Sequence, residues 1–299
     1  MPGKLNLDTA EATRVQLTRQ QQKAIHDLYK TAADRVAAEA AKAPRVPSDA
    51  LRKGYLRTLE KQLRNEMSVI GKTLRGTIKG NMTAVAGAVV SGNIDFLRSV
   101  GMPVQGAFSH VAKNVVQSVV TGKVYKGNWS LSRAIWSGTR KSQKDIQKVI
   151  AEGIAMNKSA YDIAKDLEKY LDPDAKKDWD WSKVYPGTNK VVDYNAQRLA
   201  RTMVSHAYQQ SFVRTTQKNP FVTKYQWLSS GARTCPICAD RDGQYYEKND
   251  LPLDHPNGMC TFVAVIEDSM VDIADRIADW VDGASDPALD EYAKFLLET

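Results

Sequence analysis

The stretch LRKGYLRTLEKQLRNEMSVIGKTL, residues 51–74, decides the fold class of this chain. Its apolar residues recur at steps of three or four positions, with Arg, Lys and Glu interleaved between them. Because an α-helix turns once every 3.6 residues, this spacing places one apolar stripe along an amphipathic helix. The stripe comprises Leu51, Tyr55, Leu59, Leu63, Met67, Ile70 and Leu74. We predict one long helix that ends near Gly80.

Helical spacing continues on both sides of this stretch. Asp8 and Glu11 mark a helix start, and apolar residues then recur at helical intervals until Pro44 and Pro47 break the pattern. Further on, Pro103 is expected to start a helix that carries Phe108 and ends at Gly122. Ser159 is expected to cap a short helix through Leu167, with Asp162 at the capping-box position. Two other predicted helices contain residues 146–154 and 191–218. A Pro-, Asp- and Gly-rich stretch from Leu171 to Thr188 is predicted to be a loop.

The pattern changes after Pro220. The runs KYQWLSS, GQYYE and TFVAVIED are short, aromatic or β-branched, and are separated by turn residues, which is typical of strands. Two acidic helical patterns follow, at Met270–Trp280 and Pro287–Leu297. We therefore predict a mainly α protein with a small α+β zinc-binding module near the C-terminus. The predicted segments are a helical region at 1–122, a helical middle region at 123–220, the zinc module at 221–268 and an acidic helical tail at 269–299.

Charge is distributed unevenly along the 299 residues. The whole chain has a net charge of +8. From Cys235 onward there are 4 Lys and Arg and 15 Asp and Glu, whereas the residues before Cys235 have a net charge of +19. Such a split favours contact between the first three-quarters of the chain and an acidic partner, either nucleic acid or protein, although solvated helices are also rich in Lys and Arg.

We expect no secretory leader and no membrane-spanning helix. The longest small-apolar run, Met82–Val90, is too short to cross a membrane, which needs about 18–20 residues.

All three cysteines lie between positions 235 and 260, together with a histidine. Cys235 and Cys238 have CxxC spacing, His255 follows after sixteen residues, and Cys260 follows after four more. A CxxC motif places two thiolates on a tight knuckle, and a loop of this length can bring a second pair of ligands, here His255 and Cys260, to the same ion. This arrangement suits a tetrahedral zinc ion. A closed set of three cysteines and one histidine leaves no position for water, so one structural zinc is expected. The alternative is a pair of buried thiols and an unrelated histidine.

The residues around this cluster resemble a known family. The chain shows Trp227-Leu228-Ser229, Arg233-Thr234-Cys235-Pro236-Ile237-Cys238, Asp242-Gly243, Leu251-Pro252, His255-Pro256-Asn257 and Cys260, with Leu199-Ala200-Arg201-Thr202 upstream. This pattern is similar to the C-terminal signature of phage head morphogenesis proteins, the minor head proteins related to the Mu F protein. The resemblance covers about Val191–Val265. The family usually ends this motif with His-Pro-x-Cys-Arg-Cys, whereas this chain has Gly258 at the first of those two cysteine positions.

The resemblance implies a non-enzymatic role without a small-molecule substrate. It implies a minor head protein of a tailed phage that associates with the portal protein and with major capsid or scaffold proteins of the procapsid during head morphogenesis. A contribution to DNA packaging or delivery fits the same role. The expected location is the inside of the phage head, and the host cytoplasm during assembly.

A basic stretch precedes the module. Between positions 123 and 148 the single acid is Asp145, and Trp129 and Trp136 are interleaved with seven cations. Cations with interleaved aromatic residues suit a nucleic-acid backbone, so packaged DNA is a candidate partner, whereas a solvated helix face is the simpler interpretation. The cations are Lys123, Lys126, Arg133, Arg140, Lys141, Lys144 and Lys148, of which Arg133, Arg140, Lys144 and Lys148 are spaced to share a helical face.

Two other functions stay open at this point. An HNH-type metal-dependent nuclease would use His255 as general base and Asp254 as a ligand of a catalytic divalent ion. Such nucleases close their structural zinc with a second cysteine pair, and here Cys260 alone follows. A non-catalytic zinc-containing DNA-binding adaptor would share the basic helix but would bind DNA without capsid partners.

Overall fold

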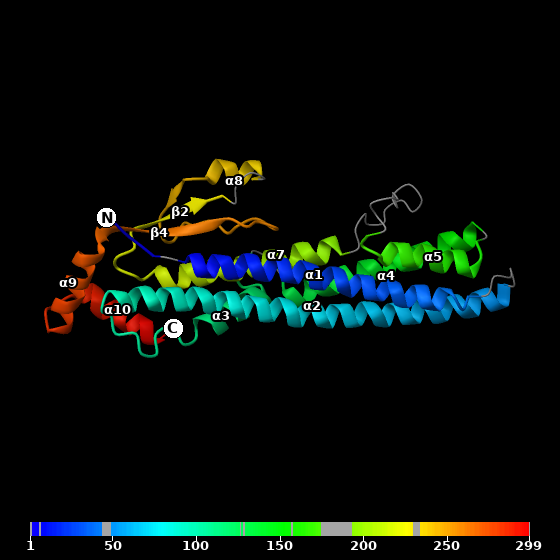
Figure 1. Ribbon diagram of the computed structural model, residues 1–299, viewed down its shortest axis with the longest axis horizontal. Helices are drawn as coiled ribbons and strands as arrows, with labels where there is room; N and C mark the ends of the chain where they lie inside the picture. The colour runs from blue at the N-terminus through cyan, green and yellow to red at the C-terminus, as the bar shows by residue number, and fades with distance from the viewer. Residues whose placement is uncertain are drawn as a thin grey trace. The chain divides into compact units, whose positions relative to one another are not determined.

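The chain is mainly helical, as its periodicity predicts. The computed structural model describes residues 2–5, 7–43, 49–125, 127, 129–156, 158–174, 193–229 and 234–298 (Figure 1). The helices are α1 (Asp8–Ala40), α2 (Asp49–Ser99), α3 (Val111–Thr121), α4 (Leu131–Ala155), α5 (Ala160–Leu171), α7 (Tyr194–Thr216), α8 (Pro236–Arg241), α9 (Met270–Val281) and α10 (Pro287–Glu298). The strands are β1 (Pro2–Lys4), β2 (Lys224–Leu228), β3 (Tyr245–Tyr246) and β4 (Thr261–Ser269).

Helix α2 contains the predicted apolar stripe, but it continues for nineteen residues beyond Gly80. The predicted end near Gly80 was wrong. A glycine in a helix costs about 1 kcal/mol relative to alanine. Burial of further apolar residues offsets this cost, since Met82, Val85 and Val89 are fully buried. The small-apolar run Met82–Val90 lies inside α2.

Helix α3 starts eight residues later than predicted. Gly106 has φ of 77° and Phe108 has φ of 57°, so both adopt left-handed backbone that a continuous right-handed helix excludes. Phe108 instead packs in the core, where its N–H donates to the Leu296 carbonyl at 3.0 Å. The predicted end at Gly122 is confirmed, because Gly122 caps α3 in the left-handed conformation.

The capping prediction at Ser159 is confirmed, because its hydroxyl accepts a hydrogen bond from the Asp162 N–H at 3.1 Å. Helix α5 runs to Leu171, four residues past the predicted end. The predicted breaks at Pro44 and Pro47 lie outside the described residues, as does most of the loop predicted from Leu171 to Thr188.

The strands form one antiparallel sheet in the order β1-β4-β2-β3 (Figure 1). Side chains alternate across β2 and β4, so Tyr225 and Trp227 on β2 and Phe262 on β4 are buried on one face. Phe212 of α7 covers that face, with ring centroids 5.0 Å from Tyr225 and 6.0 Å from Phe262. The three predicted strands are confirmed, and the edge strand β1 was not predicted.

The chain forms two compact units, and each is built from separate stretches of sequence. One unit comprises residues 1–18, 78–128 and 201–299, and the other comprises residues 19–77 and 129–200. The first holds the sheet, and the second holds α4 and α5. The linear boundaries at 122, 220 and 268 stay a prediction. None of the helices in the described ranges is apolar over a length that could cross a membrane.

Candidate metal centre

The CxxC motif forms a tight knuckle at the start of α8. Cys235 is the residue before the first helical turn, and Pro236 occupies the first helical position, where its fixed φ suits a helix and its missing N–H costs nothing. The Cys235 carbonyl accepts hydrogen bonds from the N–H groups of Cys238 and Ala239, at 3.0 and 2.9 Å. The short helix therefore brings both thiols to one side of the knuckle.

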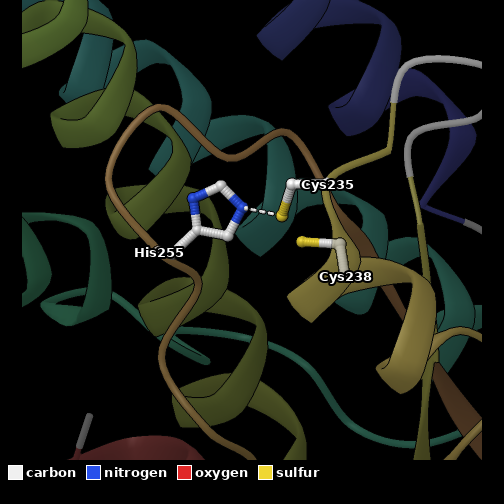
Figure 2. Close-up of side chains that lie close together, drawn as sticks. All are labelled: Cys235, Cys238 and His255. Carbon is white, nitrogen blue, oxygen red and sulfur yellow. Dashed lines mark hydrogen bonds between the residues drawn. The ribbon is translucent and has the colours of Figure 1, made fainter.

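The loop before β4 brings His255 to this knuckle, where Figure 2 shows it beside Cys235 and Cys238. Nε2 of His255 lies 3.1 Å from Sγ of Cys235, and Sγ of Cys260 lies 3.2 Å from Sγ of Cys238. The donor atoms of Cys235, Cys238 and His255 all lie within 4.8 Å of one another. Cys238 also belongs to a second group within 4.8 Å, with Cys260 and Asp254. The structure therefore brings together Cys235, Cys238 and His255, and places Cys260 beside Cys238.

The donor set fits a tetrahedral metal ion. With Zn–S bonds of about 2.3 Å and Zn–N bonds of about 2.0–2.1 Å, tetrahedral zinc separates two sulfurs by about 3.8 Å and a sulfur and a nitrogen by about 3.6 Å. The distances of 3.1 and 3.2 Å are shorter than this by about half an ångström, so each pair must open slightly to admit an ion. Cys260 is grouped with Cys238 and Asp254, so an ion held by all four predicted ligands also requires Cys260 to approach Cys235 and His255. The three thiols are free, not disulfide-bonded. This Cys/His cluster can therefore hold a metal.

The thiols and the imidazole have unequal affinities for protons. The backbone N–H of Cys238 and the neighbouring His255 lower the pKa of the Cys235 thiol. Burial raises the pKa of the Cys238 thiol. For His255, burial lowers the pKa, but the Pro256 carbonyl, Asp254 and Cys235 outweigh it, so the pKa is raised. Metal binding must displace the protons of these ligands, which makes the affinity pH-dependent.

One face of α7 holds the loop that carries His255. Arg201 donates to Oδ1 of Asn257 at 2.9 Å, and the Thr202 hydroxyl accepts from the Asn257 N–H at 2.8 Å. One turn later, the Ser205 hydroxyl donates to the Gly258 carbonyl at 2.8 Å. Gln209 donates to the Pro252 carbonyl at 2.6 Å and accepts from the Asp254 N–H at 2.8 Å. The helix therefore fixes the loop through polar contacts at helical spacing.

His206 belongs to the same face and is buried. Its Nε2 lies 2.9 Å from the Asp254 carbonyl, and its Nδ1 lies 2.7 Å from the Tyr125 hydroxyl. Because a carbonyl can only accept, Nε2 carries the proton and the Tyr125 hydroxyl donates to Nδ1. Burial lowers the pKa of His206 to about 4. His206 is thus a packed, neutral histidine whose two ring nitrogens both have partners.

The Asp254 carboxylate lies inside the loop. Its Oδ1 accepts from the His255 N–H at 2.8 Å, and its Oδ2 accepts from the Cys260 N–H at 3.3 Å. Burial raises the pKa of this carboxyl group. The carboxylate also fills the space next to Gly258, where any Cβ would collide with it. Gly258 therefore makes room for the Asp254 carboxylate.

Arg14 of α1 holds the other end of the loop. Its guanidinium is almost fully buried and donates to the Cys260 carbonyl at 2.7 Å and to the Met259 carbonyl at 3.1 Å. It also lies over the Tyr208 ring, 4.4 Å from the ring centroid. A residue 246 positions away in sequence therefore positions the backbone of a predicted metal ligand.

Sequence reasoning missed Arg14 and the structural role of Asp254. The spacing of cysteines and histidines identifies ligands, but a buried arginine in an ordinary helical pattern gives no local signal. The face of α7 was partly visible, because Arg201 and Thr202 belong to the motif that carries the family resemblance. Their partner Asn257 belongs to the same motif, and its φ of 73° is a conformation that asparagine tolerates better than most residues.

The cations predicted to contact nucleic acid fall into two groups. Lys141 and Lys148 are half-buried and lie 3.3 Å from Asp145 and 3.6 Å from Glu152, respectively. Five of the seven are on α4, where Arg133, Arg140 and Lys144 are exposed and Lys141 and Lys148 are not.

The remaining two cations precede α4. Lys123 is exposed just after α3, in the unit that contains the sheet, and Lys126 lies outside the described residues. Nucleic-acid contact by these seven residues stays a prediction.

No family model matches this chain, and neither a curated protein nor a solved structure matches it.

Proposed function

We propose that the chain is a non-catalytic minor head protein of a tailed phage, and that one structural zinc ion holds together its C-terminal module. The observation that carries the zinc part of this proposal is the cluster of Cys235, Cys238 and His255, with Cys260 next to Cys238. Three thiolates and one imidazole satisfy tetrahedral zinc completely, whereas catalytic zinc sites keep an open position for water.

The surroundings of His255 and Asp254 favour this role over an HNH-type nuclease. A general base needs a free nitrogen that faces the substrate, but Nε2 of His255 faces Cys235 and its Nδ1 lies 2.9 Å from the Pro256 carbonyl. A catalytic divalent ion needs accessible carboxylate oxygens, but those of Asp254 are buried and accept backbone hydrogen bonds. The geometry therefore suits a structural site.

The head-protein assignment rests on the resemblance to phage head morphogenesis proteins. The upstream part of that motif, Arg201-Thr202, contacts its downstream part at Asn257. Residues that are 55 and 56 positions apart in the motif thus build one unit, which supports treating them as one signature. The expected partners are the portal protein and the major capsid or scaffold proteins, in the procapsid and later inside the head.

Metal analysis of the purified chain tests the structural site. We expect one zinc ion per chain, and loss of that ion in a Cys235→Ser/Cys238→Ser variant. Plasmid DNA incubated with either protein and with Mg²⁺ or Mn²⁺ should stay intact. Cleavage that a His255→Ala substitution abolishes would identify the module as an active site and overturn the proposal.

Co-expression with the portal protein of the same phage tests the assembly role. The expected result is a complex that survives size-exclusion chromatography, and association with procapsids when capsid and scaffold proteins are added. A chain that holds zinc but binds neither portal nor procapsid, while it binds duplex DNA, would instead support the zinc-containing DNA-binding adaptor.

A further inference from the structure

A groove between α2 and α4 has features that neither the metal centre nor the head-protein role requires. It lies within the unit formed by residues 19–77 and 129–200 and has a volume of about 400 Å³. Its walls include Gly71, Lys72 and Arg75 of α2 and Ile135, Trp136 and Thr139 of α4.

Gly71 shapes the floor of the groove. A Cβ placed on Gly71 would lie 3.2 Å from Cγ2 of Thr139 and 3.4 Å from Cγ2 of Ile135. The missing side chain therefore lets α4 approach α2 closely at this point. The floor is formed by small and apolar groups, and longer side chains surround it.

The rim of the groove is positively charged. Lys72 and Arg75 line the groove, and Arg140 lies beside it, against Trp136. All three are exposed, and none of them forms an ion pair with a carboxylate in the part of the chain that the structure describes. The facing stretches 61–77 and 129–148 contain two acids. One, Glu66, pairs with Arg35 at 2.7 Å, and the other, Asp145, is buried. The groove therefore presents cations without neutralising partners.

Trp136 stands at the edge of this basic groove and is 57% exposed. The guanidinium of Arg140, one helical turn later, lies 4.8 Å from the centroid of its ring, which restricts the ring by a cation–π contact. A single exposed apolar residue needs no explanation. An exposed indole held in place beside unpaired cations, however, offers a flat stacking surface next to a site for anions.

We propose that this groove binds a single strand of nucleic acid, with phosphates against Lys72, Arg75 and Arg140 and an unpaired base stacked on Trp136. Aromatic side chains and backbone-tracking cations are the two components of sequence-tolerant single-strand binding. The site uses two residues of α2, Lys72 and Arg75, that the basic stretch 123–148 does not contain. It is independent of the metal centre and of the head-protein role.

The combination of groups decides between the possible polyanions. Duplex DNA would pair with the cations but has its bases stacked within the helix, so Trp136 would contribute little. An acidic protein segment would likewise use the cations alone. A single strand uses both the cations and the indole.

Fluorescence anisotropy of the full-length, zinc-loaded protein with a labelled oligothymidylate tests this proposal. We expect Trp136→Ala to weaken binding about tenfold, because stacking on an aromatic residue contributes about 1–3 kcal/mol per base. Trp136→Phe should retain most of the affinity. The Lys72→Ala/Arg75→Ala variant should also lower the slope of log K against log salt by about 1.4, since each phosphate contact to a single strand contributes about 0.7.

The matched control is Arg19→Ala/Lys23→Ala, which removes two exposed charges from α1 within the same unit. It should change the affinity and the salt slope far less than Lys72→Ala/Arg75→Ala. All substituted side chains are exposed, and circular dichroism should give unchanged melting curves. Equal losses in the two double variants would overturn the proposal, as would unchanged affinity in Trp136→Ala. Equal affinity for a duplex of the same length, or for polyglutamate, would also contradict it.

Discussion

Helix α2 and the loop at residues 252–260 are both fixed in place, but by opposite means. Leu63, Met67 and Met82 of α2 are fully buried, so apolar burial along one stripe holds the helix. The loop buries the Asp254 carboxylate and the Cys260 thiol and is held by hydrogen bonds from α7 and Arg14. The first arrangement tolerates a local defect such as Gly80, whereas the second depends on each polar partner and on the ion that we propose.

The largest contrast should appear when the metal is removed. Structural zinc contributes about 10–16 kcal/mol of apparent free energy in zinc-finger peptides at neutral pH. A strong chelator should therefore unfold the module around Cys235 and His255 while α2 keeps its structure. Hydrogen exchange should report lost protection in 224–228 and 261–269, with 59–74 unchanged. Equal protection with and without the metal would contradict a structural role for the ion.

A cavity in α2 should destabilise the protein without affecting the metal. Leu63 is fully buried, so Leu63→Ala should lower the free energy of unfolding by about 2–5 kcal/mol, as measured by urea denaturation. Val69→Ala on the same helix is the control, because Val69 is 51% exposed and its truncation should change stability by less than about 0.5 kcal/mol. Both variants should retain full zinc content. Loss of zinc in Leu63→Ala would contradict the view that α2 and the loop at residues 252–260 are stabilised independently.

His206 should make the stability of its unit depend on pH. In the unfolded chain its pKa is near 6.5, and burial lowers it to about 4 in the folded state. The unfolded state therefore binds the proton first, so this stability is present above pH 6.5 and falls by about 3 kcal/mol as pH drops toward 4. Comparison with His206→Gln isolates this contribution from ligand protonation. The variant should show a shallower loss between these pH values, and identical profiles would exclude His206 as the cause.

The smallest effect concerns Arg14, and it tests the polar support of the loop. Arg14→Met keeps the aliphatic stem but leaves the Met259 and Cys260 carbonyls without their donors, which should cost about 1.5–3 kcal/mol. Zinc affinity, measured by competition with a chelator, should fall together with stability. Arg19→Met on the same helix is the control, since Arg19 is exposed. Equal affinities in the two variants would show that Arg14 does not position Cys260.

Local patterns predicted most of the fold, because most of it follows from local periodicity. The stripe from Leu51 to Leu74 needs no knowledge of its partners to be recognised as a helix. The end of α2 was misplaced because Gly80 was treated as a terminator, whereas the buried side chains that follow it decide the outcome. Phe108 was assigned to a helix for the converse reason, since its spacing is helical but its contact with Leu296 fixes a turn.

The candidate site divides in the same way. The four candidate ligands could be predicted because chelation imposes a spacing on Cys235, Cys238 and the returning pair. Arg14 and Asp254 gave no such signal, because their partners are backbone groups, which every residue carries. The groove between α2 and α4 could be predicted only in part. Trp136 and Arg140 belong to the basic stretch that the sequence identifies, whereas the position of Lys72 next to them follows from the close packing of α2 and α4 at Gly71.

The contact between Arg14 and Cys260 also bears on the time course of synthesis. The ribosome synthesises Cys260 246 residues after Arg14. The first turns of α1 therefore cannot form this contact until residue 260 has been made. The unit built from residues 19–77 and 129–200 has all of its residues much earlier. We therefore predict that nascent chains stalled near residue 230 already protect α4 from protease while Arg14 stays accessible. Protection of both segments at that stage would contradict this order of folding.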